Sequence, residues 1–253
     1  MVEFEPYIAR NRHAGPHTYD LWITDALAEA WYGGDDHGIP EVLWCLAHIR
    51  EGMRVADCGA HQGIWTITFS RAVGPQGRVT AWEATPTNAV VARKNLMLNG
   101  CTNATVRTLA LGEERKRLFL SLSGEGDNAC YNETNCAAAQ VEVDCVRLDD
   151  EILPGGGLDF IKIDVDGSEL HVMRGAKNVL LSSRPILVLE IHNFLYADRH
   201  KMLAELFALL QPIRYTYSIL SEPLGAVRDT GENINLSEIA NYHNPHVFCR
   251  PMS

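Results

Sequence analysis

The segment VADCGAHQG, residues 55–63, decides the fold. It joins an apolar run typical of a buried strand to IWTITF, residues 64–69, which is typical of a packed helix. Asp57 ends the strand, and Gly59 and Gly63 lie in the connection. Glycine permits a positive φ and lets a ligand approach the main chain, and a helix N-terminus presents unpaired N–H groups to an anionic group. The segment therefore indicates a loop for a nucleotide-type cofactor, and the alternative is a strand-to-helix turn without a ligand.

Strand-like and helix-like segments alternate from residue 55 onward. This alternation is typical of an α/β fold in which helices cover both faces of a parallel sheet. Thr85 and Pro86 are suited to begin a helix that Gly100 ends. The expected strands cover residues 53–57, 78–82, 104–109, 158–163, 186–189, 213–219 and 246–249, and the expected helices lie around residues 64–73, 85–99 and 203–210.

Other segments depart from this alternation. Residues 1–17 predict an irregular arm, and helical spacing predicts one helix behind Thr18 or Asp20 and a second from Pro40. Residues 1–50 are therefore expected to form a helical cap within the same domain as the Rossmann-like residues 51–253. An inserted β-hairpin is predicted at about 116–146, and its polar loop 121–140 is either a lid or substrate loop or a disordered insertion. Residues 221–244 predict an irregular segment.

Length and charge limit the classes of protein to consider. The 253 residues are enough for one large α/β domain with a sizeable core. The formal charge of −10 argues against a nucleic acid or an anionic membrane as the main partner, because both attract clustered Lys and Arg. No apolar run approaches the roughly 18 to 20 residues of a membrane span, and the N-terminus lacks a secretory pattern. A cytoplasmic location is therefore expected.

Acidic residues end several of the expected strands, at the edge where open α/β sheets bind ligands. Glu83 lies twenty residues after Gly63, a spacing suited to hydrogen bonds with both hydroxyls of a ribose. A dinucleotide loop has the spacing G-x-G-x-x-G, whereas this loop is Asp57-x-Gly59-x-x-x-Gly63. An acid at Asp57 repels a phosphate but can hold an ammonium group, which favours S-adenosylmethionine over a nicotinamide dinucleotide. The polar strand-end residues are Asp57, Glu83, Asp164 with Asp166, and Glu190 with His192.

Five segments of the chain resemble successive motifs of the FkbM family of S-adenosylmethionine-dependent methyltransferases. They are VADCGAHQGIWT, AWEATP, ALGEERKRL, LDFIKIDVDGSELHVMRGA and RPILVLEIH, within residues 51–192. KIDVDGSE with its spacing to RGA is the most specific of them. The resemblance implies a Rossmann-like, seven-stranded, mostly parallel sheet with an antiparallel last strand. It also implies methylation of hydroxyl groups on small molecules, often sugars or polyketides.

The resemblance also implies roles for single residues. Those placed at the cofactor are Asp57, Gly59, Ala60, His61, Gly63, Glu83, Ala84, Ala110 and Asp164. The first five would form the loop at the methionine end, with His61 standing where the family often has Asn. Glu83 would bind the ribose, Ala110 would lie near the adenine, and Asp164 with Asp166 would face the methyl group.

Methyl transfer to a hydroxyl needs the acceptor oxygen about 3 Å from the methyl carbon and the loss of a proton. His192 is the first candidate base, because an imidazole titrates near neutral pH, and the alternative is a structural histidine beside Glu190. Asp164 is the second candidate base. A third hypothesis is a divalent metal, such as Mg²⁺, held by some of Asp164, Asp166, Glu190 and His192. Glu169 is interpreted as an acid of the first turn of a helix.

The sequence thus predicts a methyltransferase that modifies a hydroxyl of a sugar, polyketide or other natural product. The alternatives are an N-methyltransferase, which would act on an amine, and a cofactor-binding subunit without catalysis. The expected partner is a small-molecule acceptor, with no nucleic acid and no membrane. The oligomeric state stays open, with a homodimer as one option.

Overall fold

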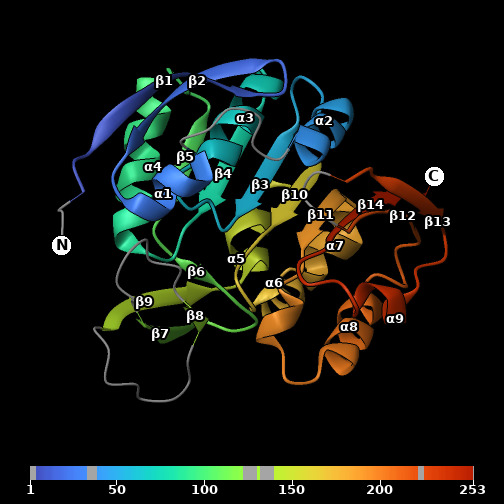
Figure 1. Cartoon of the computed structure of the whole chain (residues 1–253). Coiled ribbons are helices and arrows are strands. Elements are labelled where there is room, and N and C mark those ends of the chain that lie inside the picture. The colour runs from blue at the N-terminus through green and yellow to red at the C-terminus, as the bar shows by residue number, and fades with distance from the viewer. Residues whose placement is uncertain (1–3, 33–38, 122–129, 132–139, 222–224, 253) are drawn as a thin grey trace.

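An eight-stranded sheet runs through the centre of the molecule (Figure 1). The computed structural model describes residues 4–32, 39–121, 130–131, 140–221 and 225–252. The strand order is β13-β12-β14-β11-β10-β3-β4-β5. The strands are β3 (Arg54–Cys58), β4 (Arg78–Trp82), β5 (Ala104–Arg107), β10 (Phe160–Ile163), β11 (Ile186–Glu190), β12 (Tyr215–Leu220), β13 (Arg228–Gly231) and β14 (His246–Pro251). The seven predicted strands are present, and β13 adds an eighth at one edge.

The strand directions agree with the predicted Rossmann-like sheet. Neighbouring strands from β5 to β11 are parallel, whereas β14 is antiparallel to both β11 and β12. The antiparallel last strand is therefore confirmed, and it lies between β11 and β12. The strand order reverses between β3 and β10. The carboxyl ends of these two strands are thus the place where a sheet of this kind binds its ligand.

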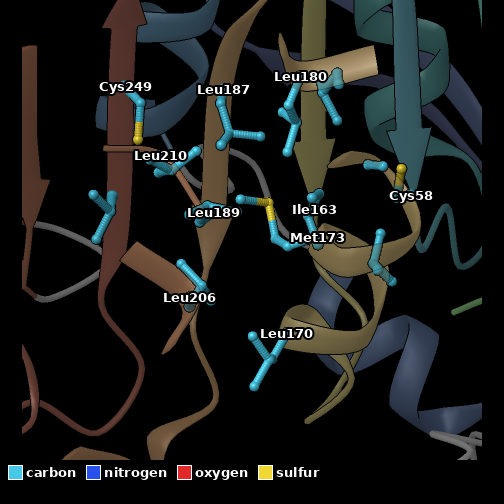
Figure 2. Close-up of a cluster of buried hydrophobic side chains, with 14 of the residues drawn as sticks. Cys58, Ile163, Leu170, Met173, Leu180, Leu187, Leu189, Leu206, Leu210 and Cys249 are labelled. Atoms are coloured by element: carbon cyan, nitrogen blue, oxygen red, sulfur yellow. The ribbon is translucent and has the colours of Figure 1, made fainter. Parts of the chain in front are cut away.

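Helices cover both faces of the sheet, because successive side chains of a buried strand point to opposite faces. Ile163 of β10 belongs to one hydrophobic cluster, and Phe160 of the same strand belongs to another. Figure 2 shows Ile163 and Leu189 of β11 next to Met173, which comes from a covering helix. The helices are α1 (Ala26–Tyr32), α2 (Ile39–His48), α3 (Ile64–Ala72), α4 (Pro86–Leu98), α5 (Leu148–Ile152), α6 (Glu169–Gly175), α7 (Lys177–Ser183), α8 (Arg199–Ala208) and α9 (Leu236–Ile239), with 3₁₀ turns at Leu153–Gly155 and Asn193–Leu195. Within the described ranges, none of these helices has the length and apolar character needed to cross a membrane.

The N-terminal region contains a β-hairpin, which corrects the predicted irregular arm and the predicted first helix. β1 (Tyr7–Ala14) pairs antiparallel with β2 (His17–Ile23), and the hairpin lies along α4 (Figure 1). The N–H of Trp22 in β2 donates to the side chain of Asn95 in α4 at 2.7 Å. Helix α1 begins only after Asp25, which accepts an N–H of its first turn at 2.7 Å. The expected helical cap is therefore a hairpin followed by the short helices α1 and α2.

The insertion predicted at residues 116–146 forms most of a second sheet, of order β6-β9-β7-β8. β7 (Lys116–Ser121) and β9 (Gln140–Val146) pair antiparallel, which confirms the predicted hairpin. β6 (Ala110–Leu111) and β8 (Cys130–Tyr131) complete this sheet. The rest of the predicted loop, residues 122–129 and 132–139, lies outside the described residues. The segment predicted as irregular, 221–244, contains β13 and α9.

Candidate active site

The loop between β3 and α3 lies at the centre of the carboxyl edge of the sheet. Its glycines, Gly59 and Gly63, have φ values of 88° and 91°, as predicted for a tight turn. A Cβ at Gly59 would lie 1.7 Å from the backbone oxygen of Asp164, and a Cβ at Gly63 would lie 3.2 Å from Ala92 of α4. Close packing of the chain against itself therefore requires glycine at the first position and favours it at the second.

Several N–H groups of this loop are used inside the protein. Those of Gly59 and Ala60 donate to the carbonyl of Trp82 at 2.9 and 3.0 Å, and that of His61 donates to Glu83 at 2.7 Å. The other oxygen of Glu83 accepts the N–H two residues along the chain at 2.8 Å. Burial raises the pKa of Glu83 to about 7, and these hydrogen bonds act in the opposite direction. Glu83 thus lies beside the loop, and its carboxylate, which has about four lone-pair sites, can also accept from a ligand hydroxyl.

Asp57 is fully buried within β3, although it is predicted to contact the cofactor. One of its oxygens accepts the hydroxyl of Thr66 at 2.6 Å, and the other has no hydrogen-bond partner in the described part of the chain. Its neighbour across the sheet is Lys162 of β10. Burial raises the pKa of Asp57 to about 6, while Lys162 and Thr66 oppose that rise. The carboxylate therefore faces Thr66 and Lys162 inside the sheet, and its contact with the cofactor through the second oxygen stays a prediction.

Lys162 is a fully buried cation surrounded by acids, and sequence reasoning missed it as a site residue. Its ammonium lies 2.6 Å from Asp164, 4.0 Å from Glu190 and 5.2 Å from the ring centroid of Trp65. Burial alone would lower the pKa of Lys162, but Asp164, Glu41 and Glu190 raise it above its usual value. A buried charge persists only where partners compensate it. Lys162 therefore holds the strand-end carboxylates together, a role that the strand-like sequence around it does not indicate.

His192 lies among carboxylates after β11. Its Nδ1 is 2.6 Å from Glu169, and its Nε2 is 3.0 Å from Asp166 and 3.8 Å from Asp164. Burial alone would lower the pKa of His192, but hydrogen bonds to Asp166 and Glu169 raise it to about 11. The ring is therefore a cation at neutral pH with both nitrogens engaged, which is at odds with its predicted role as the base.

The second predicted base, Asp164, is also a weak proton acceptor in this arrangement. Burial alone would raise the pKa of Asp164, but Lys162 and His192 lower it to about 2. Asp164 and Asp166 remain 27% and 29% exposed at the side chain, so both can meet a ligand. Asp166 has a φ of 41°, which is uncommon outside glycine and is found most often for Asn and Asp.

Glu169 begins α6, as predicted for an acid of a first helical turn. It is also fully buried and accepts hydrogen bonds from His192 at 2.6 Å, from the N–H of Gly167 at 3.1 Å and from the hydroxyl of Tyr196. Its main role in the structure is therefore to orient and charge His192. The spacing Asp164-x-Asp166-x-x-Glu169 does not indicate this role, because Glu169 meets His192 only in the folded chain.

A second buried histidine, His246, lies next to Glu190. His246 of β14 faces Glu190 in the sheet register, and its Nδ1 lies 3.1 Å from Glu41 of α2. Burial alone would lower the pKa of His246, but Glu41 and Glu190 raise it to about 9. Burial and Asp164 raise the pKa of Glu190 to about 7, and Asn244 donates to Glu190 at 2.6 Å. Sequence reasoning missed Glu41 and His246, because they are far apart in the chain and follow no motif.

Helix α1 closes over the cofactor loop. The hydroxyl of Tyr32 lies 2.6 Å from Nδ1 of His61, and the side-chain amide of Gln62 donates to Asp25 at 2.8 Å. Burial lowers the pKa of His61 to about 4, so its ring is neutral at neutral pH. With the Tyr32 hydroxyl as donor, the ring carries its hydrogen on Nε2. This Nε2 is buried without a partner among the described residues.

The residues predicted near the ribose and the adenine also come together. Ala110 is buried in a small cluster with Leu120, Val143 and Cys145 of the second sheet, and Ala84 packs against this cluster. The second sheet therefore packs against Ala84, the residue that follows Glu83 at the end of β4. The structure thus gathers the predicted residues at one edge of the central sheet, with Asp57 behind that edge.

Comparison with known proteins agrees with this geometry. The chain matches the methyltransferase FkbM domain over residues 57–219. The chain belongs to the FkbM methyltransferase family. The matched part of this FkbM chain begins at Asp57 and includes Glu83, Asp164 and His192, whereas Glu41 and His246 lie outside it.

The FkbM chain is similar to methyltransferases of several organisms. It is 25% identical over 164 residues to methyltransferase sdnD of Sordaria araneosa, covering 51% of this chain and 62% of sdnD. It is 30% identical over 160 residues to a catechol O-methyltransferase of Mycobacterium tuberculosis, covering 56% of this chain and 71% of that protein. The crystal structure of methyltransferase FkbM from Methylobacillus flagellatus aligns with 78% of this chain and 43% of that chain, at a TM-score of 0.50 and 18% identity, which shows a shared fold. The match therefore spans less than two thirds of sdnD and less than half of the crystallised FkbM protein.

S-adenosylmethionine, the cofactor of the FkbM family, fits the residues present. Glu83 offers buried carboxylate oxygens to ribose hydroxyls, and Nε2 of His61 is a buried donor without a partner in the described ranges. Both groups adjoin the loop after β3. The partly exposed Asp164 and Asp166 lie across the loop at the end of β10.

Proposed function

We propose that this chain transfers the methyl group of S-adenosylmethionine to a hydroxyl oxygen of a small molecule. The observation that carries the proposal is the arrangement at the carboxyl edge of the sheet. The loop and Glu83 lie at the ends of β3 and β4, and the partly exposed Asp164 and Glu190 lie at the ends of β10 and β11. A cofactor site and a polar acceptor site therefore adjoin each other. The similarity to a catechol O-methyltransferase supports oxygen as the acceptor atom.

Bound S-adenosylmethionine supplies an electrophilic methyl group. The residues of the chain have to orient the acceptor, exclude water and take up a proton. Helix α1, joined to the loop through Tyr32 and His61, covers the cofactor side. Asp164 and Asp166 can accept hydrogen bonds from the acceptor hydroxyl, and the proton released on methylation can pass through these partly exposed carboxylates to solvent. Their negative charge stabilises the positive charge that develops on that oxygen as the new C–O bond forms.

A divalent cation that lowers the pKa of the acceptor is a second candidate mechanism. One ligand atom each from Asp164, Glu190 and His192 lies within 4.8 Å of the others, which favours this option. Against the metal, Asp164 already contacts Lys162, and Nε2 of His192 already contacts Asp166. Both side chains are therefore engaged inside the protein. Methyl transfer measured before and after treatment with a chelator separates the two mechanisms, because only the metal-assisted reaction should stop.

Calorimetric titration with S-adenosylhomocysteine tests the proposed cofactor site, with NADH as the competing ligand. Glu83→Gln should weaken binding of S-adenosylhomocysteine by about 10- to 100-fold, because a hydrogen bond to a charged group contributes about 1.5–3 kcal/mol. Glu114→Gln, at an exposed site just before the insertion, is the matched control and should bind as the unaltered chain does. Absence of S-adenosylhomocysteine binding, or preference for NADH, would overturn the proposal.

Transfer of a labelled methyl group to a panel of hydroxyl and amine compounds then tests the acceptor. Labelling of hydroxyl compounds is the expected result. Labelling of amines alone would support an N-methyltransferase, and binding without transfer to any compound would support a cofactor-binding subunit.

A further inference from the structure

We propose that Glu41, Glu190 and His246 form a binding site for a divalent transition-metal ion, Mn²⁺ or Zn²⁺, beside the methyl-transfer site. One ligand atom from each side chain lies within 4.8 Å of the others. Two carboxylates and one imidazole are ligands that these ions accept. Three protein ligands also leave a position open, as in catalytic zinc sites. The site joins α2, β11 and β14, which are distant in the chain.

The unpartnered atoms of Glu41 and His246 provide an independent observation. Glu41 is 4% exposed, and its Oε1 is buried without a hydrogen-bond partner in the described ranges. Its Oε2 lies 3.1 Å from Nδ1 of His246, and this nitrogen also lacks a partner with hydrogen-bond geometry. Buried polar atoms are nearly always satisfied in native proteins. An ion bound between these two side chains would satisfy both.

The neighbouring group around Asp164 is a poorer site for an ion. Its ligand atoms are equally close, within 4.8 Å, but they are already engaged. Asp164 lies 2.6 Å from the ammonium of Lys162, and the two nitrogens of His192 lie 2.6 Å from Glu169 and 3.0 Å from Asp166. An ion there would have to displace Lys162. The proposed ion site therefore involves β11 and β14, whereas the sequence predicts an ion at the ends of β10 and β11.

The charges around Glu190 can accommodate an added ion. An ion that binds His246 displaces its proton, and the neutral imidazole with the carboxylates of Glu41 and Glu190 then carries two negative charges, which balance one divalent ion. Lys162 lies 2.6 Å from Asp164 and 4.0 Å from Glu190, and its charge is stabilised by Asp164, Glu41, Glu190 and Asp57. The ion would therefore share Glu41 and Glu190 with Lys162, while Asp164 and Asp57 still compensate the ammonium.

An ion at this place would bind an oxygen of the acceptor and lower the pKa of its hydroxyl. This role rests on the proposed methyl transfer, whereas the binding of the ion does not. Binding is therefore tested by itself, with no acceptor present.

The full chain, freed of metal with a chelator, is titrated with MnCl₂ and with ZnCl₂ by calorimetry, and bound Mn²⁺ is counted by electron paramagnetic resonance. We expect one ion per chain. Glu41→Gln and His246→Gln should each weaken its binding by about 100-fold or more. Asp164→Asn and His192→Gln, which alter the neighbouring group, should weaken binding clearly less than Glu41→Gln does, because neither side chain would ligate the ion.

Two results would overturn this inference. One is the absence of stoichiometric binding of both ions to the unaltered chain, and the other is a loss in Asp164→Asn as large as that in Glu41→Gln. The far-ultraviolet circular dichroism of every variant is measured as a test of folding, and S-adenosylhomocysteine is titrated separately into the unaltered chain. Because that titration tests the cofactor site of the unaltered chain, failure of the proposed function is distinguished from failure of the ion site.

Discussion

Replacement of Lys162 by Met tests whether the buried ammonium holds the site together. Met removes the charge with little change in side-chain length. The ammonium lies 2.6 Å from Asp164 and 4.0 Å from Glu190, and at an effective dielectric constant of about 20 these distances correspond to attractions of about 6 and about 4 kcal/mol. The variant also avoids the desolvation cost of the cation, which is several kcal/mol. The free energy of unfolding should therefore fall by about 3–5 kcal/mol, as is typical when one partner of a buried ion pair is removed.

This loss should depend on pH, because Lys162 opposes the burial that raises the pKa of Asp57 to about 6 and is the main group that lowers the pKa of Asp164 to about 2. Without Lys162, the pKa of Asp57 rises further above the unfolded value of about 3.9. The pKa of Asp164, which lies below that value in the unaltered chain, rises as well. A carboxyl whose pKa is raised on folding destabilises the protein at high pH, and this cost disappears as pH falls toward the unfolded pKa. The loss should therefore be largest at pH 8 and smaller at pH 5.

Urea unfolding of both chains between pH 5 and pH 8 measures the loss, provided that the slopes with urea concentration agree. Lys177→Met, at an exposed position of α7, is the matched control and should stay within about 0.5 kcal/mol of the unaltered chain. A loss below about 1 kcal/mol at pH 8, or one that is the same at every pH, would refute the reasoning.

Two further predictions concern the loop and the histidine. Gly59→Ala should lower the free energy of unfolding by about 2–5 kcal/mol in urea unfolding, since its Cβ would meet the Asp164 carbonyl at 1.7 Å and φ is 88°. Gly100→Ala, where φ is 65° and no described atom lies within 4 Å of the Cβ, should cost only about 1–2 kcal/mol, and equal losses would contradict the steric explanation. The imidazole of His192 should remain protonated at pH 8 in nitrogen-15 NMR, because its pKa is raised to about 11. It should therefore stabilise the fold fully below about pH 6.5 and less as pH rises toward 11, and Glu169→Gln should lower its pKa; titration of the unaltered His192 near pH 6.5 would refute this.

Local patterns predict much of the central sheet. The predicted strand 78–82 coincides with β4, and Thr85, Pro86 and Gly100 mark the ends of α4 as expected. Such signals are local, because the period of apolar residues and the capping residues act within a few positions of the chain.

Local patterns fail in the N-terminal region. Residues 17–23 form β2, although their apolar residues also fit the start of a helix. Their main-chain N–H groups donate to Asn95 of α4 at 2.7 Å and to Asn99, which directly follows α4, at 3.0 Å. A contact between segments more than seventy residues apart therefore decides this element, and no local pattern contains it.

The sequence by itself determined the parallel sheet and the strand-end acids Glu83, Asp164 and Glu190, because the carboxyl ends of parallel strands meet at one edge. Only the tertiary structure decided how those acids are charged and paired. Lys162 and His192 became buried cations because folding surrounded them with carboxylates, and Glu41 joined the site because α2 packs beside β14. Ionisation and partnership depend on burial and on distances of a few ångströms, which residue order along the chain does not specify.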